Sequence, residues 1–310
     1  VGNAYVEPTS NDVAMYELYY QHGLVSKLVH DQWVDAGCTS AEGYPQNVTK
    51  CWDIEFFMYV EAGYEINPYA LSYPICVAED ERFTSRGITS LHSPQARTLM
   101  RKKFSQLKES NILKDASYDP CAEDYLSNYL NRPDVQEAIH ATVGAEWDVC
   151  SDPVWYQWDL ASFYEKQMKY YIELLQGDYD LNMLVFSGDD DSVCATTGTQ
   201  FWIYDLGVEV KPDHWWDIWH VDGQTAGYFA QFELDAISTT SNSSFVFATV
   251  HHAGHEVPAY KPKEAFDLWE RFLTQNWDVS SAAEVHGDAK DEVLAKDARV
   301  EDEEEMMLVA

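Results

Sequence analysis

The sequence predicts an α/β fold in which helices flank a mixed sheet. Two short apolar runs of β-type residues, Asn182 to Ser187 and Phe245 to Val250, have the length and composition of strands. Segments with helical character alternate with them, at Phe163 to Gln176, Thr196 to Leu206 and Lys263 to Gln275. Strands that alternate with helices in this way are typical of α/β architecture.

The N-terminal part of the chain is organised around an insertion. A strand and a helix are expected from Val1 to about Asp35, before the insertion begins. The insertion extends over residues 36–125, rich in Gly and Tyr at first and helical from Ser93 to Leu113. A loop and an amphipathic helix follow from Asp124 to His140, with Pro133 near the first turn.

The chain is strongly acidic, with 53 acids against 20 Lys and Arg residues and a formal net charge of −33. Such a charge repels polyphosphate, so nucleic acid is not expected as a partner. An acidic compartment would relieve the repulsion, but an ordinary soluble acidic surface explains the charge equally well. No apolar run approaches 18 residues, and no membrane span is expected.

The last residues, 284–310, form a separate acidic segment. It holds ten acids, three Lys or Arg residues and no aromatic side chain, so we expect a disordered tail after a domain that extends over residues 1–283. The chain has no initiating Met and no signal peptide, and we expect its start to result from truncation or processing.

The loops that follow the two predicted strands carry the candidate catalytic residues. Gly188 and Asp189 to Asp191 follow the first strand, and His255 follows the second. Because loops at the carboxyl ends of strands meet at one edge of a sheet, Asp191 and His255 are expected to converge. An acid followed 64 positions later by a histidine fits the last two members of the Ser, Asp, His order of α/β-hydrolases. No Gly-x-Ser-x-Gly occurs, so the nucleophile is missing.

These motifs resemble the C-terminal portion of a serine carboxypeptidase of the vacuolar, lysosomal and plant type. Gly-Asp-Asp-Asp-Ser-Val matches that family's Gly-Asp-x-Asp-x-Val, and Ala-Gly-His-Glu-Val-Pro matches its Gly-x-Gly-His-x-Val-Pro. The resemblance covers roughly residues 1–275 and implies an α/β-hydrolase-like mixed sheet whose first strands are missing. It places the triad acid at Asp191 and the triad histidine at His255.

The resemblance also implies a reaction. Members release C-terminal residues from peptides or proteins through a Ser-Asp-His triad and use no cofactor. Their Gly-Glu-Ser-Tyr-Ala-Gly motif lies before the strand that begins here at Val1, so this chain alone is expected to be inactive and to need an N-terminal segment or chain that carries the Ser. An acyltransferase with the same triad, or a catalytically inactive binding or chaperone-like relative, remains an alternative.

Four of the six cysteines fall in the insertion. Cys38 and Cys51 flank the glycosylation sequon at Asn47, and a second sequon begins at Asn242. Cysteines around a sequon favour a secretory route. The resemblance implies the disulfides Cys38–Cys51 and Cys76–Cys121 within an insertion that caps the active site, and a vacuolar, lysosomal or extracellular location.

Three further residues are candidates at or near the site. Cys150 matches a family cysteine whose partner lies upstream, although a buried inert thiol is the alternative. Cys194, three residues after Asp191, resembles a free thiol found near the active site of some members. Glu256, directly after His255, borders the pocket for the leaving residue or is a solvated loop carboxylate.

Two other clusters of residues could form binding sites. His251, His252 and His255 could suggest zinc, but consecutive histidines on a continuing strand would point to opposite faces and no His-Glu-x-x-His helix is present, so no metal is expected. Trp215, Trp216 and Trp219 could stack on a ligand. A core and pocket-lining role is the preferred interpretation.

Overall fold

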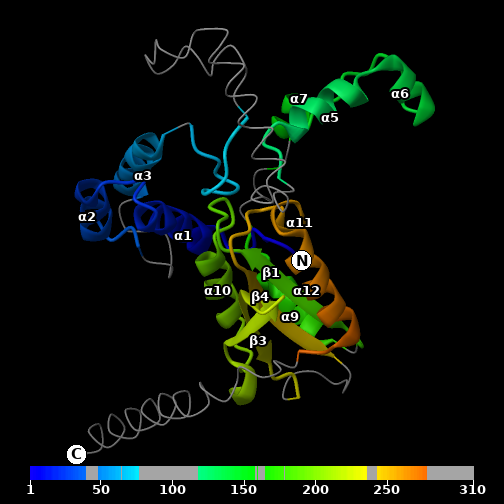
Figure 1. Ribbon diagram of the computed structural model, residues 1–310. Helices are drawn as coiled ribbons and strands as arrows, with labels where there is room; N and C mark the ends of the chain where they lie inside the picture. Colours follow the sequence, from blue (N-terminus) through cyan, green and yellow to red (C-terminus); the bar gives the residue numbers. More distant parts are fainter. Residues whose placement is uncertain are drawn as a thin grey trace, which may run out of the picture.

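The chain folds around a four-stranded mixed sheet with helices on both faces (Figure 1). The structure is a computed structural model that describes residues 1–39, 48–63, 65–76, 118–157, 159, 165–177, 179–235 and 243–277. The strand order is β1-β4-β3-β2, from strands β1 (Asn182–Gly188), β2 (Asp217–Val221), β3 (Gln224–Phe232) and β4 (Ser244–Val250). β1 and β4 are parallel, and the other pairs are antiparallel.

The central strands are buried on both faces. Met183, Val185 and Phe247 face one core, which helices α9 (Met168–Gln176) and α10 (Thr196–Tyr204) cover. The opposite side chains face a second core beneath α11 (Val257–Tyr260) and α12 (Pro262–Thr274). Because neither face of these strands meets water, their sequences are nearly continuous apolar runs.

Trp219 belongs to the second core. Its side chain is fully buried, and its indole N–H donates a 3.0 Å hydrogen bond to the carbonyl oxygen of Thr249. Trp216 is partly buried and stacks on Tyr228 with ring centroids 5.7 Å apart. These contacts agree with the preferred core interpretation of the two tryptophans.

The first helices form a third core beside the sheet. Helices α1 (Pro8–Gln21), α2 (Lys27–Asp35) and α3 (Val48–Ala62) enclose Trp33, Met58 and the Cys38–Cys51 disulfide. Figure 1 shows these helices to one side of the sheet. The disulfide confirms the first pairing that the resemblance implied.

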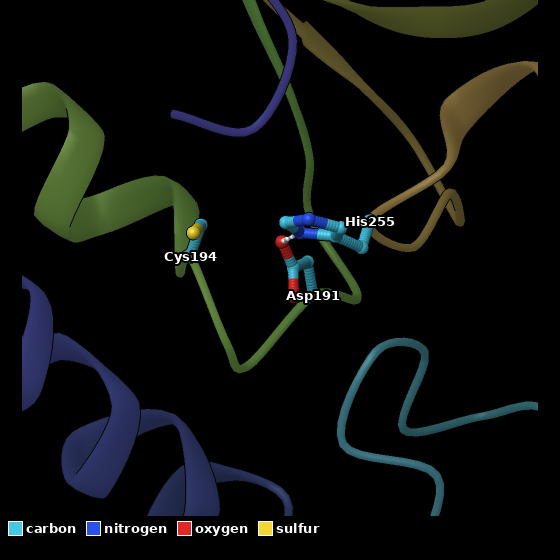
Figure 2. Close-up of side chains that lie close together, drawn as sticks. All are labelled: Asp191, Cys194 and His255. Carbon is cyan, nitrogen blue, oxygen red and sulfur yellow. Dashed lines mark hydrogen bonds and ion pairs between the residues drawn. The ribbon is translucent and has the colours of Figure 1, made fainter. Parts of the chain in front are cut away.

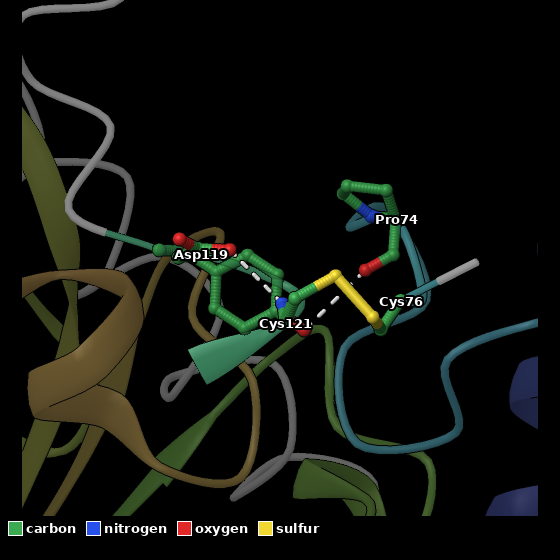
Figure 3. The surroundings of a disulfide bond; sticks show 5 residues. Pro74, Cys76, Asp119 and Cys121 are labelled. Carbon is green, nitrogen blue, oxygen red and sulfur yellow. Dashed lines mark hydrogen bonds between the residues drawn. A yellow bond between two sulfur atoms is a disulfide. The ribbon is translucent and has the colours of Figure 1, made fainter. Parts of the chain in front are cut away.

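A second disulfide joins the two described ends of the insertion. Cys76 is bonded to Cys121, with Cα atoms 4.8 Å apart, and Tyr118 Oη donates to the carbonyl oxygen of Pro74 beside it (Figure 3). Helices α5 (Ala122–Leu130), α6 (Pro133–Ala138) and α7 (Asp152–Trp155) follow and extend away from the sheet in Figure 1. This second pairing is also confirmed, and Cys150 and Cys194 are free in the structure.

The two predicted strands and the three helices predicted after residue 160 agree with the structure to within a few residues. Between Asp124 and His140, helices α5 and α6 lie where a loop and one helix were expected. The hairpin of β2 and β3 and the short 3-10 helix η3 (Pro212–His214) were not predicted. The N-terminal strand is reduced to a single parallel bridge between Gly2 and Phe186, and two helices follow it where one was expected. Within the described part of the chain, no helix is long and apolar enough to cross a membrane.

Several predictions concern residues outside the described ranges. They are the helix at 93–113, the sequons at Asn47 and Asn242, and the acidic tail at 284–310.

Candidate active site

Asp191 lies in the loop after β1 and is fully buried. Its Oδ1 accepts a 2.8 Å hydrogen bond from the backbone N–H of Val193, and its Oδ2 accepts one of 2.8 Å from the side-chain amide of Asn3. A buried carboxylate requires such partners, because removing a charge from water is costly unless hydrogen bonds replace the lost hydration. The local turn and the start of the chain therefore fix the orientation of Asp191.

His255 lies in the loop between β4 and α11, and its ring meets Asp191 (Figure 2). The distance from His255 Nδ1 to Asp191 Oδ2 is 2.7 Å. The backbone N–H of His255 donates a 2.8 Å hydrogen bond to the carbonyl oxygen of Tyr69, whose ring packs edge-on against the imidazole. The structure thus brings together the two residues that the sequence motifs singled out.

A glycine at the end of β1 allows the two loops to approach. A Cβ atom on Gly188 would lie 2.3 Å from the carbonyl oxygen of Ala253 and 2.4 Å from that of Gly254. The backbone N–H of Asp190 donates to the same Ala253 oxygen at 2.9 Å. Any larger side chain at position 188 would push apart the loops that carry Asp191 and His255.

The hydrogen bond to Asp191 changes the acidity of His255. It raises the pKa of His255 from 6.5 to about 10, and the neighbouring Cys194 thiol acts in the same direction. A carboxylate that accepts from Nδ1 fixes the tautomer and stabilises the imidazolium. This arrangement leaves the other ring nitrogen for proton transfer.

Cys194 lies beside this pair, just before α10. The residue is 3% exposed, and burial raises the pKa of its thiol although the neighbouring His255 opposes the shift. One donor atom from each of Asp191, Cys194 and His255 lies within 4.8 Å of the other two, which makes the three residues a possible metal-binding group. Cys194 therefore lies next to His255.

The neighbouring acids have different contacts. Asp189 accepts from the ring of His251 and, at 2.7 Å, from the backbone N–H of His252. Asp189 and Asp190 both lie in the turn after β1, as the sequence predicted. Asp190 Oδ1 and Oδ2 accept from the hydroxyl and backbone N–H of Ser72 at 2.9 and 2.8 Å.

The condition under which His251 and His252 would point to opposite faces is not met. β4 ends at Val250, so the alternation of an extended strand does not continue, and His252 has a left-handed φ of 55°. The two rings consequently lie with centroids 4.0 Å apart. Neither residue joins His255 in the metal-binding group found among the described residues.

Part of the insertion lies directly on these loops. The backbone N–H of Leu71 donates to the carbonyl oxygen of Asp190 at 3.0 Å, and the hydroxyl of Ser192 donates to that of Pro68 at 2.6 Å. Glu256 is exposed, immediately before α11. Its role at a pocket remains a prediction.

Sequence reasoning missed Asn3 as a partner of Asp191. Asn3 is 4% exposed, has a left-handed φ of 41° and also accepts from the backbone N–H of Gly188 at 3.3 Å. Asn3 lies within the part of the chain that the family resemblance covers, but the sequence does not say what its side chain contacts.

Comparisons with known proteins indicate one protein family. A family model described as serine carboxypeptidase matches residues 1–275. Serine carboxypeptidase-like 26 from Arabidopsis thaliana is 31% identical over 88% of this chain and 53% of its own length. P-(S)-hydroxymandelonitrile lyase from Sorghum bicolor is 30% identical over 84% of this chain and 46% of its own length.

A solved structure has the same fold. Kex1Δp, a prohormone-processing carboxypeptidase from Saccharomyces cerevisiae, matches with a TM-score of 0.54 at 15% identity over 88% of this chain and 53% of its own. The chain therefore spans about half the length of the relatives it matches.

Proposed function

The chain belongs to the serine carboxypeptidase family, and from this premise we propose that it supplies the acid and the base of a serine-type carboxypeptidase. The observation that supports the proposal is the 2.7 Å contact between His255 Nδ1 and the fully buried Asp191. The substrate would be the C-terminus of a peptide or protein.

In this proposal His255 acts as the general base and then as the general acid. It takes the proton from a serine hydroxyl as that oxygen attacks the scissile carbonyl carbon, and it returns a proton to the leaving amine. Asp191 holds the imidazole through Nδ1 and stabilises the imidazolium. The hydrogen bonds from Asn3 and Val193 keep the carboxylate in place during this cycle.

The serine belongs to a segment or chain that acts together with these residues. The printed sequence holds no Gly-x-Ser-x-Gly, and loss of a triad nucleophile lowers kcat by about 10⁶-fold. We therefore propose that the 310-residue chain alone has no peptidase activity and that activity requires an N-terminal partner segment. The bridge between Gly2 and Phe186 places the N-terminal residues against β1, where that segment would enter the sheet.

The proposed setting is the secretory pathway, in a vacuole, a lysosome or the extracellular space. Two disulfides fit an oxidising compartment, since cytosolic thiols are kept reduced. Attached sugar at Asn47 and Asn242, read by mass spectrometry of material made in a secretory host, would support this setting. Absence of sugar at both sequons would count against it.

The test is complementation. The chain is produced with and without a segment that carries Gly-x-Ser-x-Gly, taken from a relative such as serine carboxypeptidase-like 26, and each is incubated with an N-blocked dipeptide. Release of the C-terminal amino acid by the mixture alone supports the proposal. The controls are Ser→Ala in the added segment and His255→Gln in this chain, which should each remove the activity.

Other outcomes identify the alternatives. Transfer of an acyl group from an ester to an acceptor alcohol, without peptide hydrolysis, would indicate an acyltransferase. Cyanide release from p-hydroxymandelonitrile would indicate the reaction that the sorghum relative is named for. Serine-dependent turnover by the purified chain alone would overturn the proposed division of the triad.

A further inference from the structure

Three different metal-binding atoms meet beside β1. Asp191 follows the strand, Cys194 follows three residues later before α10, and His255 arrives from the loop after β4 (Figure 2). One oxygen, one sulfur and one nitrogen from these residues lie within 4.8 Å of one another. The group is the only one of its kind among the described residues.

The chemistry of the donors selects the class of ion. Thiolate, imidazole and carboxylate are the ligands of Zn²⁺, and three protein ligands with one open position are typical of reactive zinc sites. Hard ions such as Mg²⁺ and Ca²⁺ take oxygen ligands instead. A mixed set with sulfur therefore favours Zn²⁺ and its spectroscopic substitute Co²⁺ over Mg²⁺.

The spacing requires only modest shifts of the donor atoms. Ligands at 2.0 to 2.3 Å from a tetrahedral ion lie roughly 3.3 to 3.8 Å apart. Donor atoms that are as far as 4.8 Å apart must therefore close by about 1 Å, whereas the 2.7 Å contact between His255 Nδ1 and Asp191 Oδ2 must open if those two atoms bind the ion. Asp191 and Cys194 are buried, whereas the side chain of His255 is 30% exposed. The exposed side of His255 is also the side from which an ion can enter.

A layer of hydrogen bonds supports the first ligand. Asn3 donates to Asp191 Oδ2 and the backbone N–H of Val193 donates to Oδ1, each at 2.8 Å. Partners behind a ligand hold it in position and are part of most metal sites. In addition, the net charge of −33 raises the local concentration of cations around the chain.

We propose that Asp191, Cys194 and His255 form a site that binds one Zn²⁺ ion, and that the bound ion occupies the imidazole needed as a base. Metal binding goes beyond the proposed peptidase reaction and does not require it, because all three ligands belong to this chain. In a complemented enzyme, zinc would act as a reversible inhibitor, because the imidazole that binds the ion cannot accept a proton.

Direct binding of Co²⁺ to the full chain tests the proposal. The starting protein is Cys150→Ser, which removes the other free thiol and leaves both disulfides intact. The expected result is one Co²⁺ per chain with a sulfur-to-cobalt charge-transfer band, displaced by Zn²⁺ but not by Mg²⁺. Absence of that band in the Cys150→Ser protein would overturn the proposal.

The variants assign the ligands. Cys194→Ser should abolish the charge-transfer band, and His255→Gln should weaken Co²⁺ binding by at least about tenfold. The matched control is His251→Gln with His252→Gln, which removes the neighbouring imidazoles and should leave the band unchanged. Retention of the band in Cys194→Ser, or its loss in this control, would contradict the assignment.

A second measurement avoids dependence on how the variants fold. In the Cys150→Ser protein, Zn²⁺ should slow the alkylation of Cys194 by iodoacetamide, read by peptide mass spectrometry, and a chelator should reverse the protection. Equal alkylation with and without Zn²⁺ would count against the site even if another part of the chain binds the ion.

Discussion

The side-chain amide of Asn3 donates a 2.8 Å hydrogen bond to Oδ2 of Asp191, the same oxygen that lies 2.7 Å from His255 Nδ1. Asn3 and Asp191 are 188 positions apart in the chain, and both are almost fully buried. The start of the chain therefore supports the carboxylate on which the candidate site depends.

We first predict that Asn3→Ala destabilises the fold. The variant leaves a buried charge with one fewer hydrogen bond, and bonds to charged groups contribute about 1.5 to 3 kcal/mol. The measurement is the free energy of unfolding in urea at pH 7. Gln21→Ala, which removes an exposed amide, should change it by less than about 0.5 kcal/mol, and equal losses in the two variants would contradict the prediction.

A second prediction separates the acids in the turn after β1. In the complemented enzyme, Asp191→Asn should lower kcat by roughly 10⁴ with little effect on folding, because the geometry persists while the histidine tautomer is wrong. Asp189→Asn should cost far less, since Asp189 contacts His251 and His252 instead. Steady-state kinetics on a blocked dipeptide decides this, and comparable losses would reject Asp191 as the triad acid.

Asp191 and His255 were predictable as site residues because they follow recognisable strands. β1 and β4 are nearly continuous buried runs, and the loops after such strands lie at one edge of the sheet. The role of Asn3 was not predictable, because it depends on tertiary contact between the start of the chain and β1. Likewise, only the end of β4 at Val250 explains why His251 and His252 lie together.

The missed hairpin had a local signal. Asp222 and Gly223 occupy the turn between β2 and β3 with φ of 51° and 74°, as a two-residue type I′ turn requires. An Asp-Gly pair between apolar segments is a strong hairpin signal. Gly227 within β3 and the bulge between Trp219 and His220 weaken the alternating pattern that would identify the strands.

A third prediction concerns pH. The folded state raises the pKa of His255 from 6.5 to about 10, so it binds this proton more tightly than the unfolded chain does. The resulting stabilisation is complete below about pH 6.5, declines as the pH rises and is lost above about pH 10. The difference in the free energy of unfolding between the wild type and His255→Gln should follow that course.

Urea titrations at several pH values between 5 and 10.5 measure this difference. His140→Asn, which replaces an exposed histidine with a residue that tolerates its left-handed φ of 59°, is the control and should show no comparable decline. A difference for His255→Gln that stays constant, or that grows with pH, would contradict the assigned contact with Asp191.

The last prediction concerns the Cys38–Cys51 disulfide. Both cysteines are 2% exposed and lie in the third core with Trp33 and Met58. The bond limits the unfolded chain, so the double variant Cys38→Ser with Cys51→Ser should lower the free energy of unfolding by about 2 to 4 kcal/mol. Urea unfolding under non-reducing conditions gives the value.

Cys150→Ser, at an exposed free thiol, is the control and should leave stability within about 0.5 kcal/mol of the wild type. Because Cys38 follows α2 and Cys51 lies in α3, away from the sheet, the loss should melt this third core without separating Asp191 from His255. Unchanged stability in the double variant would mean that apolar packing alone holds these helices together.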